Sequence, residues 1–231
     1  MRRHLSEWTV SSPSVKGLTA TIPTPLRVLV LGTGTGVGKT VFATSLVREL
    51  RTLGVDAVGL KPVETGPDEG SDGSALAAAS TAPPSSLYRF APPISPHLAA
   101  RRVGVTIELG RIGRWVDELA REATVIEGAG GVFSPFSADA VNLDLVLSVR
   151  PSVLVLVCAG RLGVLHEVGA TLRATPDAPW ARIVVSAVAG LHECSIQAAE
   201  LASVVVPQSG RSIPVSVFDP THSALSCLGF T

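Results

Sequence analysis

A glycine-rich segment that ends in Gly-Lys-Thr holds the residues best suited to chemistry: Gly32-Thr33-Gly34-Thr35-Gly36-Val37-Gly38-Lys39-Thr40. It follows the apolar run 28–31 and precedes an amphipathic stretch, 41–53, which predicts a buried strand, a turn and a helix start. Backbone N–H groups of such a turn point at one spot, and the helix dipole favours negative charge there. The motif therefore predicts a phosphate cradle, with Lys39 on the terminal phosphates and the Thr40 hydroxyl on Mg²⁺. The residues expected to contact the nucleotide here are Gly36, Val37, Gly38, Lys39, Thr40 and Val41.

The loop is one residue longer than the usual phosphate-binding motif. Counting back from Gly38-Lys39-Thr40, the first glycine of that motif falls at position 33, which is Thr33, and the nearest glycine is Gly32. A glycine-rich turn that binds nothing is the alternative, but the Gly-Lys-Thr ending and the strand–turn–helix context favour phosphate binding.

Lys61 closes the second predicted strand, residues 57–61, within Lys61-Pro62-Val63-Glu64-Thr65-Gly66. A lysine at the end of a buried strand is costly unless its ammonium reaches an anion or water. The chain contains only three lysines, Lys16, Lys39 and Lys61, among its 19 basic residues. Because the chain otherwise uses arginine, we expect Lys39 and Lys61 to be needed as compact point charges. The alternative is a lysine that extends into solvent.

Two acidic residues are candidates for organising a metal–nucleotide complex. Glu127 ends the apolar run 124–126 and is followed by Gly128-Ala129-Gly130-Gly131, whose glycines let the backbone approach a ligand. Beside a phosphate loop, a carboxylate at a strand end is expected to position Mg²⁺; the alternative is a solvated glutamate in a glycine-rich turn. Asp72, in the acidic loop before a predicted helix, is either the helix N-cap or a metal-site residue, and the local sequence leaves both open.

Short apolar runs alternate with helical stretches from Arg27 onward, which predicts an α/β fold with a mostly parallel central sheet flanked by helices in three layers. Ligands of such sheets bind at the carboxyl ends of the strands. With the glycine-rich loop, this predicts a single P-loop NTPase domain over residues 26–231. The predicted strands are 28–31, 57–61, 124–127, 153–158, 183–188 and 215–218. The predicted helices are 39–53, 74–79, 96–102, 107–123, 143–149, 164–174, 196–204 and a short one after Thr221.

The rest of the composition argues against several classes of protein. Residues 1–25 are rich in Ser, Thr and Pro and lack the apolar core of a secretory signal, which predicts a flexible extension. No apolar run approaches the ~20 residues that span a bilayer. The formal net charge of +0 gives no indication of nucleic-acid binding. Cys158, Cys194 and Cys227 fit no zinc spacing, and we expect buried thiols in a reducing cytoplasm.

Several segments, taken in order, resemble the dethiobiotin synthetase family. They are the glycine-rich loop, Lys61-Pro62-Val63-Glu64-Thr65-Gly66, Ser71-Asp72, Ser95-Pro96-His97, Glu127-Gly128-Ala129-Gly130-Gly131 and Arg161-Leu162-Gly163. The resemblance implies ATP- and Mg²⁺-dependent closure of 7,8-diaminononanoate with CO₂ into dethiobiotin, a step of biotin biosynthesis. It also implies a carbamate, a carbamic–phosphoric anhydride and a homodimer.

Matching the family's motif positions assigns roles to individual residues. The resemblance implies that Lys39 holds the phosphates and that Lys61 bridges the carbamate and the γ-phosphate. Residues implied to organise Mg²⁺ are Thr40, Asp72 and Glu127, and those implied to contact the nucleotide further along are Gly128, Ala129 and Gly130. Those implied to hydrogen-bond the substrate are Thr35 and Thr65, while the helix start at Gly163, Val164 and Leu165 of a neighbouring subunit would receive its carboxylate.

Other interpretations remain open. A nucleotide-dependent switch or partitioning ATPase usually carries an extra lysine early in the loop, and positions 33–37 contain none. A P-loop synthetase that works with a glutaminase domain would need a longer chain. A diverged, inactive homologue is a further alternative. Base preference is also open, because the segment Ser186-Ala187-Val188 lacks the asparagine with which family members often read adenine.

Overall fold

The computed structural model describes residues 22–80, 86–187 and 190–230. The predicted extension, residues 1–25, lies outside these ranges except for residues 22–25, of which Ile22 packs against the core. No helix in the described part of the chain is both long and apolar enough to cross a membrane.

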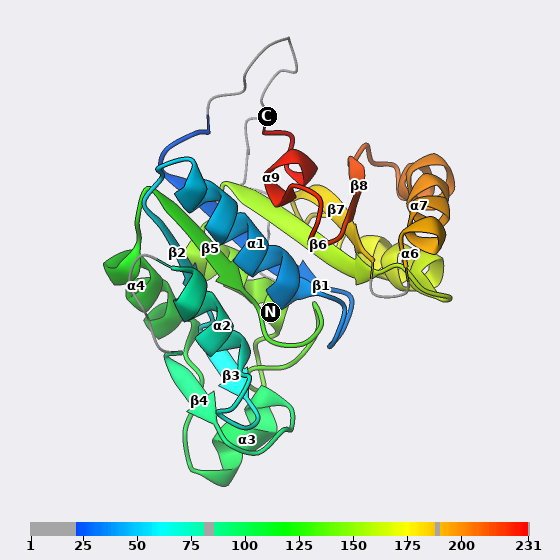
Figure 1. Cartoon of the computed structure of the whole chain (residues 1–231). Coiled ribbons are helices and arrows are strands. Elements are labelled where there is room, and N and C mark those ends of the chain that lie inside the picture. Colours follow the sequence, from blue (N-terminus) through cyan, green and yellow to red (C-terminus); the bar gives the residue numbers. More distant parts are fainter. Residues whose placement is uncertain (1–21, 81–85, 188–189, 231) are drawn as a thin grey trace.

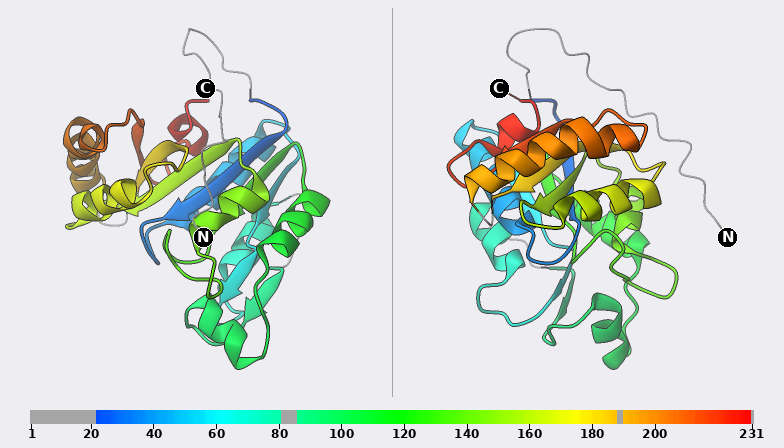
Figure 2. Two further views of the ribbon diagram at one scale, coloured as in Figure 1. Left: turned by 180° about the vertical axis from the view of Figure 1, so that it is seen from behind. Right: turned by 90° about the vertical axis from the view of Figure 1, so that its right-hand side faces the viewer.

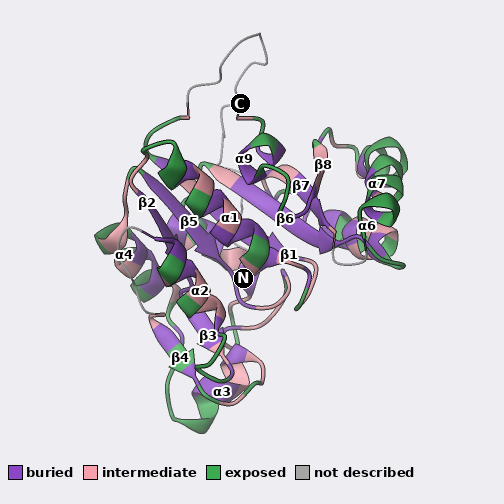
Figure 3. Cartoon of the chain, viewed as in Figure 1, coloured by how far each residue is buried: buried purple, intermediate pink, exposed green. Residues whose placement is uncertain are grey.

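Six parallel strands form the central sheet, which confirms the predicted mostly parallel sheet. Their order is β2-β5-β1-β6-β7-β8, which the sequence did not predict (Figure 1). Both faces of this sheet are covered, and its strands are largely buried (Figure 3). This explains the continuous rather than alternating apolar runs. The strands are β1 (Leu26–Gly32), β2 (Ala57–Leu60), β5 (Ala123–Glu127), β6 (Val153–Ala159), β7 (Trp180–Ser186) and β8 (Val215–Phe218).

Helices cover the two faces of the sheet as separate layers (Figure 2). On one face, α1, α2 and α9 form a core cluster that includes Val28 and Val30. On the other face, α4, α5, α6 and α7 form a second cluster that includes Leu29 and Leu31. The helices are α1 (Lys39–Thr52), α2 (Asp72–Ala79), α3 (Pro96–Arg102), α4 (Leu109–Leu119), α5 (Leu145–Val149), α6 (Val164–Ala174), α7 (Leu191–Glu200), α8 (Val206–Gln208) and α9 (Ala224–Cys227). A 3-10 turn (Asn142–Asp144) precedes α5, and a π-helical turn (Leu201–Val205) joins α7 to α8.

Several element bounds differ from the sequence-based expectation. The helix predicted over 107–123 ends at Leu119, because Ala123 is already paired in register with Leu26 and Ala57 as the first residue of β5. The strand predicted over 183–188 runs from Trp180 to Ser186, and position 188 lies outside the described residues. The helix predicted over 196–204 begins earlier, at Leu191.

A second, two-stranded parallel sheet was not predicted. It pairs β3 (Val63–Thr65) with β4 (Tyr88–Phe90) beside α2 and α3 (Figure 1). Strands of three residues are too short to show a periodicity in the sequence. This small sheet places the segment after Lys61 against the first turn of α2, which matters for the site described below.

Candidate functional site

The glycine-rich loop connects β1 to α1 at the carboxyl edge of the sheet. Gly38, with φ 96° and ψ 13°, is the N-cap of α1 and has no side chain that could occupy the helix N-terminus. Such a left-handed conformation strongly favours glycine. The first turn of α1 therefore presents its N–H groups to any anion held by the loop.

Gly32 is required by the way this long loop folds back on the strand. A Cβ at position 32 would lie 2.8 Å from Val37 Cγ2 and 2.9 Å from Lys39 Cδ, closer than real Cβ contacts. The additional residue, Thr33, donates its hydroxyl to Glu167 Oε2 in α6 at 3.0 Å. The lengthened loop thus packs closely against Val37 and Lys39 at Gly32 and is hydrogen-bonded to α6 through Thr33.

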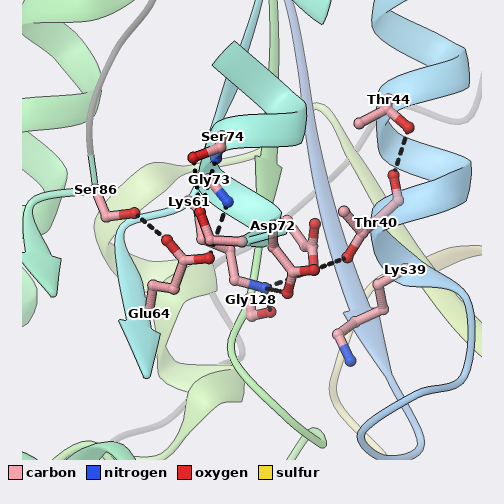
Figure 4. A network of polar contacts seen from close by, with 12 residues as sticks. Lys39, Thr40, Thr44, Lys61, Glu64, Asp72, Gly73, Ser74, Ser86 and Gly128 are labelled. Atoms are coloured by element: carbon pink, nitrogen blue, oxygen red, sulfur yellow. Dashed lines mark hydrogen bonds and ion pairs between the residues drawn. The ribbon is translucent and has the colours of Figure 1, made fainter. Parts of the chain in front are cut away.

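Lys61 and Glu127 meet because their strands are neighbours in the sheet. Leu60 of β2 is paired with Ile126 of β5, so Lys61 and Glu127 leave the sheet at the same level. Lys61 Nζ donates to Glu127 Oε1 at 2.5 Å and to Asp72 Oδ2 at 2.9 Å (Figure 4). Parallel strands bring their carboxyl ends to one edge, which is why residues 66 positions apart in sequence are in contact.

Thr40 completes this cluster from the phosphate loop. Its hydroxyl lies 2.8 Å from Asp72 Oδ1 and 2.9 Å from Glu127 Oε1, and its single proton can be donated to one of them at a time (Figure 4). The cluster therefore joins the start of α1, the end of β2, the end of β5 and the start of α2 around two carboxylates and one ammonium.

The charges of the cluster follow from burial and pairing. Burial alone would lower the pKa of Lys61, but the Glu127 and Asp72 carboxylates outweigh it and raise that pKa above its ordinary value. Burial raises the pKa of Glu127, an effect that Lys61 opposes. For Asp72 the ammonium of Lys61 outweighs burial and holds the pKa of the carboxyl below its ordinary value. Lys61 is therefore a permanent cation at neutral pH.

Lys39 stands beside this cluster but is held by the loop itself. Its Nζ donates to the Gly34 carbonyl at 2.8 Å, and its side chain is not among the contacts drawn between the other site residues (Figure 4). Burial, and next the positive charge of Lys61, lower the pKa of Lys39 to about 8. Both lysines lie at the same edge of the sheet, as predicted, and their charges repel each other.

The cap of α2 decides one of the two possibilities for Asp72, that it is the helix N-cap. Ser71 is the N-cap, and its hydroxyl accepts a hydrogen bond from the Ser74 N–H at 3.2 Å. The N-cap alternative for Asp72 is therefore wrong. Asp72 is the first helical residue, and its carboxylate turns toward Lys61 and Thr40.

The donor set of the cluster fits a magnesium ion held jointly with phosphates. Within the described part of the chain, Glu127 Oε2 is buried without a hydrogen-bond partner, an arrangement that is costly unless a cation or water supplies one. No group of three or more His, Cys, Asp or Glu side chains forms a metal site among the described residues. Two carboxylates and a hydroxyl, completed by phosphate oxygens and water, match the preference of Mg²⁺.

A cleft of about 410 Å³ adjoins the cluster. Of the predicted site residues, it is lined by Thr35, Lys61, Thr65, Asp72, Ala129 and Gly130. Residues that line it without having been predicted as site residues are Val63, Glu64, Pro93, Ile94, Ser95, Pro96 and Ser134. For Ser134 the sequence offered only a weak signal, its place three residues after Gly131. In the structure its hydroxyl accepts the Gly131 N–H at 2.8 Å.

The predicted contacts at Gly163, Val164 and Leu165 lie elsewhere in the chain. They form the start of α6, where Gly163 has φ 97°, and Val164 is fully buried. Leu165 lines a separate hollow of about 100 Å³ together with other residues of α6 and with Val205, Gln208 and Ser209. A single chain thus does not bring these residues into the cleft of Lys61.

A parallel sheet, a glycine-rich loop ending in Gly-Lys-Thr after β1 and a buried carboxylate at the end of a neighbouring strand define a P-loop nucleotide-binding protein. A family model described as an AAA domain matches residues 26–198. The ATP-dependent dethiobiotin synthetase of Anaeromyxobacter dehalogenans is 40% identical over 155 residues, which cover 64% of this chain and 69% of the relative. That of Xanthomonas oryzae pv. oryzae is 38% identical over 162 residues, covering 65% of this chain and 72% of the relative. The chain belongs to the dethiobiotin synthetase family.

Solved structures share the fold at much lower identity. The chloroplast FtsY of Physcomitrella patens has a TM-score of 0.51 and 15% identity, covering 93% of this chain and 68% of its own. The FtsY of Elizabethkingia anophelis has a TM-score of 0.50 and 15% identity, covering 91% and 67%. At such identity the likeness shows the P-loop fold alone.

Proposed function

We propose that this protein is a dethiobiotin synthase, an ATP- and Mg²⁺-dependent ligase that closes the ureido ring of dethiobiotin from 7,8-diaminononanoate and CO₂. The observation that carries the proposal is the buried Lys61–Glu127 pair beside the phosphate loop, in a chain 40% identical to a dethiobiotin synthetase. Family membership supports the substrate, and the cluster supports phosphoryl transfer at this edge of the sheet.

The reaction requires the site to hold several negatively charged groups close together. One substrate amine attacks CO₂ and loses a proton to give a carbamate. A carbamate oxygen then attacks the γ-phosphorus and ADP leaves, which forms a carbamic–phosphoric anhydride. The second amine attacks the carbonyl carbon and loses a proton, the bond from that carbon to the phosphate oxygen breaks, phosphate leaves, and the ring is closed. Because both phosphoryl donor and acceptor are anions, positioning and charge neutralisation supply most of the catalysis.

The predicted site residues of the cleft and of the phosphate loop have the following roles in this scheme. Lys61, held as a cation by two carboxylates, bridges the carbamate and the γ-phosphate from the end of β2. Lys39 exchanges the Gly34 carbonyl for phosphate oxygens when the nucleotide binds. The hydroxyls of Thr35 and Thr65, which line the same cleft, hydrogen-bond the diamine. Backbone groups of Gly36, Val37, Gly38, Val41, Gly128, Ala129 and Gly130 complete the nucleotide contacts.

Magnesium belongs to the same proposal. Thr40, Asp72 and Glu127 would hold it, and it would neutralise charge that develops on the β- and γ-phosphates. The partnerless Oε2 of Glu127 supports this assignment, because a buried carboxylate oxygen needs a cation or a donor.

A homodimer completes the proposed site. The start of α6 lies outside the cleft of its own chain, so Gly163, Val164 and Leu165 would receive the substrate carboxylate in the cleft of a second copy. The adjacent Leu162 is 92% exposed, which supports an interface at this end of α6.

The test is phosphate release and dethiobiotin formation with diaminononanoate, bicarbonate, Mg²⁺ and each of the four nucleoside triphosphates. We expect release that depends on the diamine, and its abolition by Lys61→Ala. Arg48→Ala, an exposed change on α1, serves as the matched control for loss of a basic side chain and should behave as the parent. Hydrolysis that needs no diamine and survives Lys61→Ala would instead support a nucleotide switch.

A further inference from the structure

Glu64 is a buried carboxylate with no part in the scheme above. It lies on β3, between Lys61 and Thr65, with 4% of its surface exposed. Its Oε1 accepts the backbone N–H of Gly73 at 3.0 Å, and its Oε2 accepts the Ser86 hydroxyl at 3.0 Å (Figure 4). The Arg89 guanidinium forms an ion pair with the same carboxylate. Glu64 is therefore satisfied by three partners from two segments of the chain, the first turn of α2 and residues 86–89.

Gly73 fits against this carboxylate with no space left. A Cβ at position 73 would lie 2.6 Å from Glu64 Oε2 and 2.8 Å from Ser86 Oγ. Gly73 does not have a left-handed backbone conformation, so the constraint on a side chain there is space: a Cβ would have to displace the Glu64 carboxylate and the Ser86 hydroxyl, or the helix itself. The first turn of α2 is consequently seated directly on β3.

This contact lies one residue from Asp72. The loop that leads to α2 is exposed over residues 67–70 and offers little packing to fix the helix start. Asp72, by contrast, has to keep its carboxylate 2.9 Å from Lys61 Nζ and 2.8 Å from Thr40 Oγ1. Besides the bonds of Asp72 itself, the hydrogen bond from the Gly73 N–H to the buried Glu64 fixes the backbone of the adjoining residue.

We propose that Glu64 is a positioning residue: it anchors the first turn of α2 through Gly73 and thereby sets the place of the Asp72 carboxylate. The inference rests on the metal role of Asp72 in the proposed function. Replacing a residue that orients a metal-binding side chain typically lowers metal affinity or activity by about 10- to 100-fold. Loss of Glu64 should therefore weaken metal-dependent binding without removing any group that contacts the nucleotide.

Calorimetric titration of the full chain with ATP, once with Mg²⁺ and once with EDTA, measures this directly. For Glu64→Ala we expect an unchanged Kd for ATP in EDTA and a loss of about 10-fold or more in the affinity gained from Mg²⁺. Arg51→Ala is the matched control, because Arg51 Nη1 holds the opposite end of α2 through the Ala79 carbonyl at 3.0 Å. It should lower stability and leave the Mg²⁺ effect as in the parent.

Gly73→Ala separates positioning from stability and also serves if Glu64→Ala does not fold. Alanine favours the helix over glycine, whereas the added methyl group fits only if α2 and the Glu64 and Ser86 side chains separate, which breaks the contact between them. We expect a Mg²⁺ effect reduced as in Glu64→Ala. An unchanged Mg²⁺ effect in Gly73→Ala, or an equal reduction in Arg51→Ala, would overturn the inference. Because the readout is ATP binding, it stands apart from dethiobiotin formation, whose absence would overturn the proposed function alone.

Discussion

Lys61 Nζ and Glu127 Oε1 lie 2.5 Å apart with side-chain exposures of 4% and 0%. Two opposite charges so far from solvent depend on each other, because each would be costly to bury alone. The pair therefore links the reaction chemistry at this edge of the sheet to the stability of the fold.

Removing one member of the pair should cost more than removing both. We expect Lys61→Met to lose about 3–5 kcal/mol of unfolding free energy, because it leaves the Glu127 carboxylate buried without its cation. The double variant Lys61→Met/Glu127→Gln should recover most of that loss, since no buried charge remains between the two positions, and both variants should lack synthase activity. Denaturant titration without nucleotide measures the difference. A double variant as unstable as the single one would show that the pair does not act as a unit.

Lys39 should make the nucleotide-free protein less stable near neutral pH. Its pKa is about 8 in the folded chain against 10.5 for an ordinary lysine, so the unfolded chain binds more protons between these values. The loss of folding free energy caused by the charged Lys39 is fully present below pH 8 and decreases as the pH rises toward 10.5. Lys39→Met should therefore be about 2–3 kcal/mol more stable than the parent near neutral pH. Denaturant titrations at several pH values test this, and a stability difference that does not shrink at alkaline pH would contradict it.

Two glycines of the phosphate loop should respond differently to the same substitution. Gly32→Ala places a methyl group 2.8 Å from Val37 Cγ2. We expect this overpacking to lower the free energy of unfolding by about 1–3 kcal/mol and also to weaken ATP binding. Gly34→Ala is the matched control, because the nearest atom, Val37 Cγ1, would be 3.9 Å away. Thermal unfolding and ATP titration of the two variants measure the contrast, and equal losses at both positions would argue against the packing explanation.

Local patterns were sufficient for the elements that carry the chemistry. The apolar run before Gly32 predicted β1. Lys61 and Glu127 could be placed at strand ends, because a charged residue next to an apolar run is costly to bury inside a strand that is covered on both faces. The parallel sheet followed from the alternation of strands and helices. These inferences succeed because burial on both faces of a sheet leaves a continuous apolar signal in the sequence.

Contacts between distant segments were decided only by the tertiary structure. Three such contacts leave no periodic pattern in the sequence. They are the hydrogen bond from Gly73 to Glu64, the hydrogen bond from Thr33 to Glu167 and the pairing of β3 with β4. The sequence alone left Asp72 between a helix cap and a metal-site residue, and the neighbouring Ser71 turned out to be the cap. Residue type and spacing can indicate which groups are costly to bury alone. The hydrogen-bond or ion-pair partner of each group depends on the order of the strands in the sheet and on how closely the backbones pack. Both arise only when the chain folds.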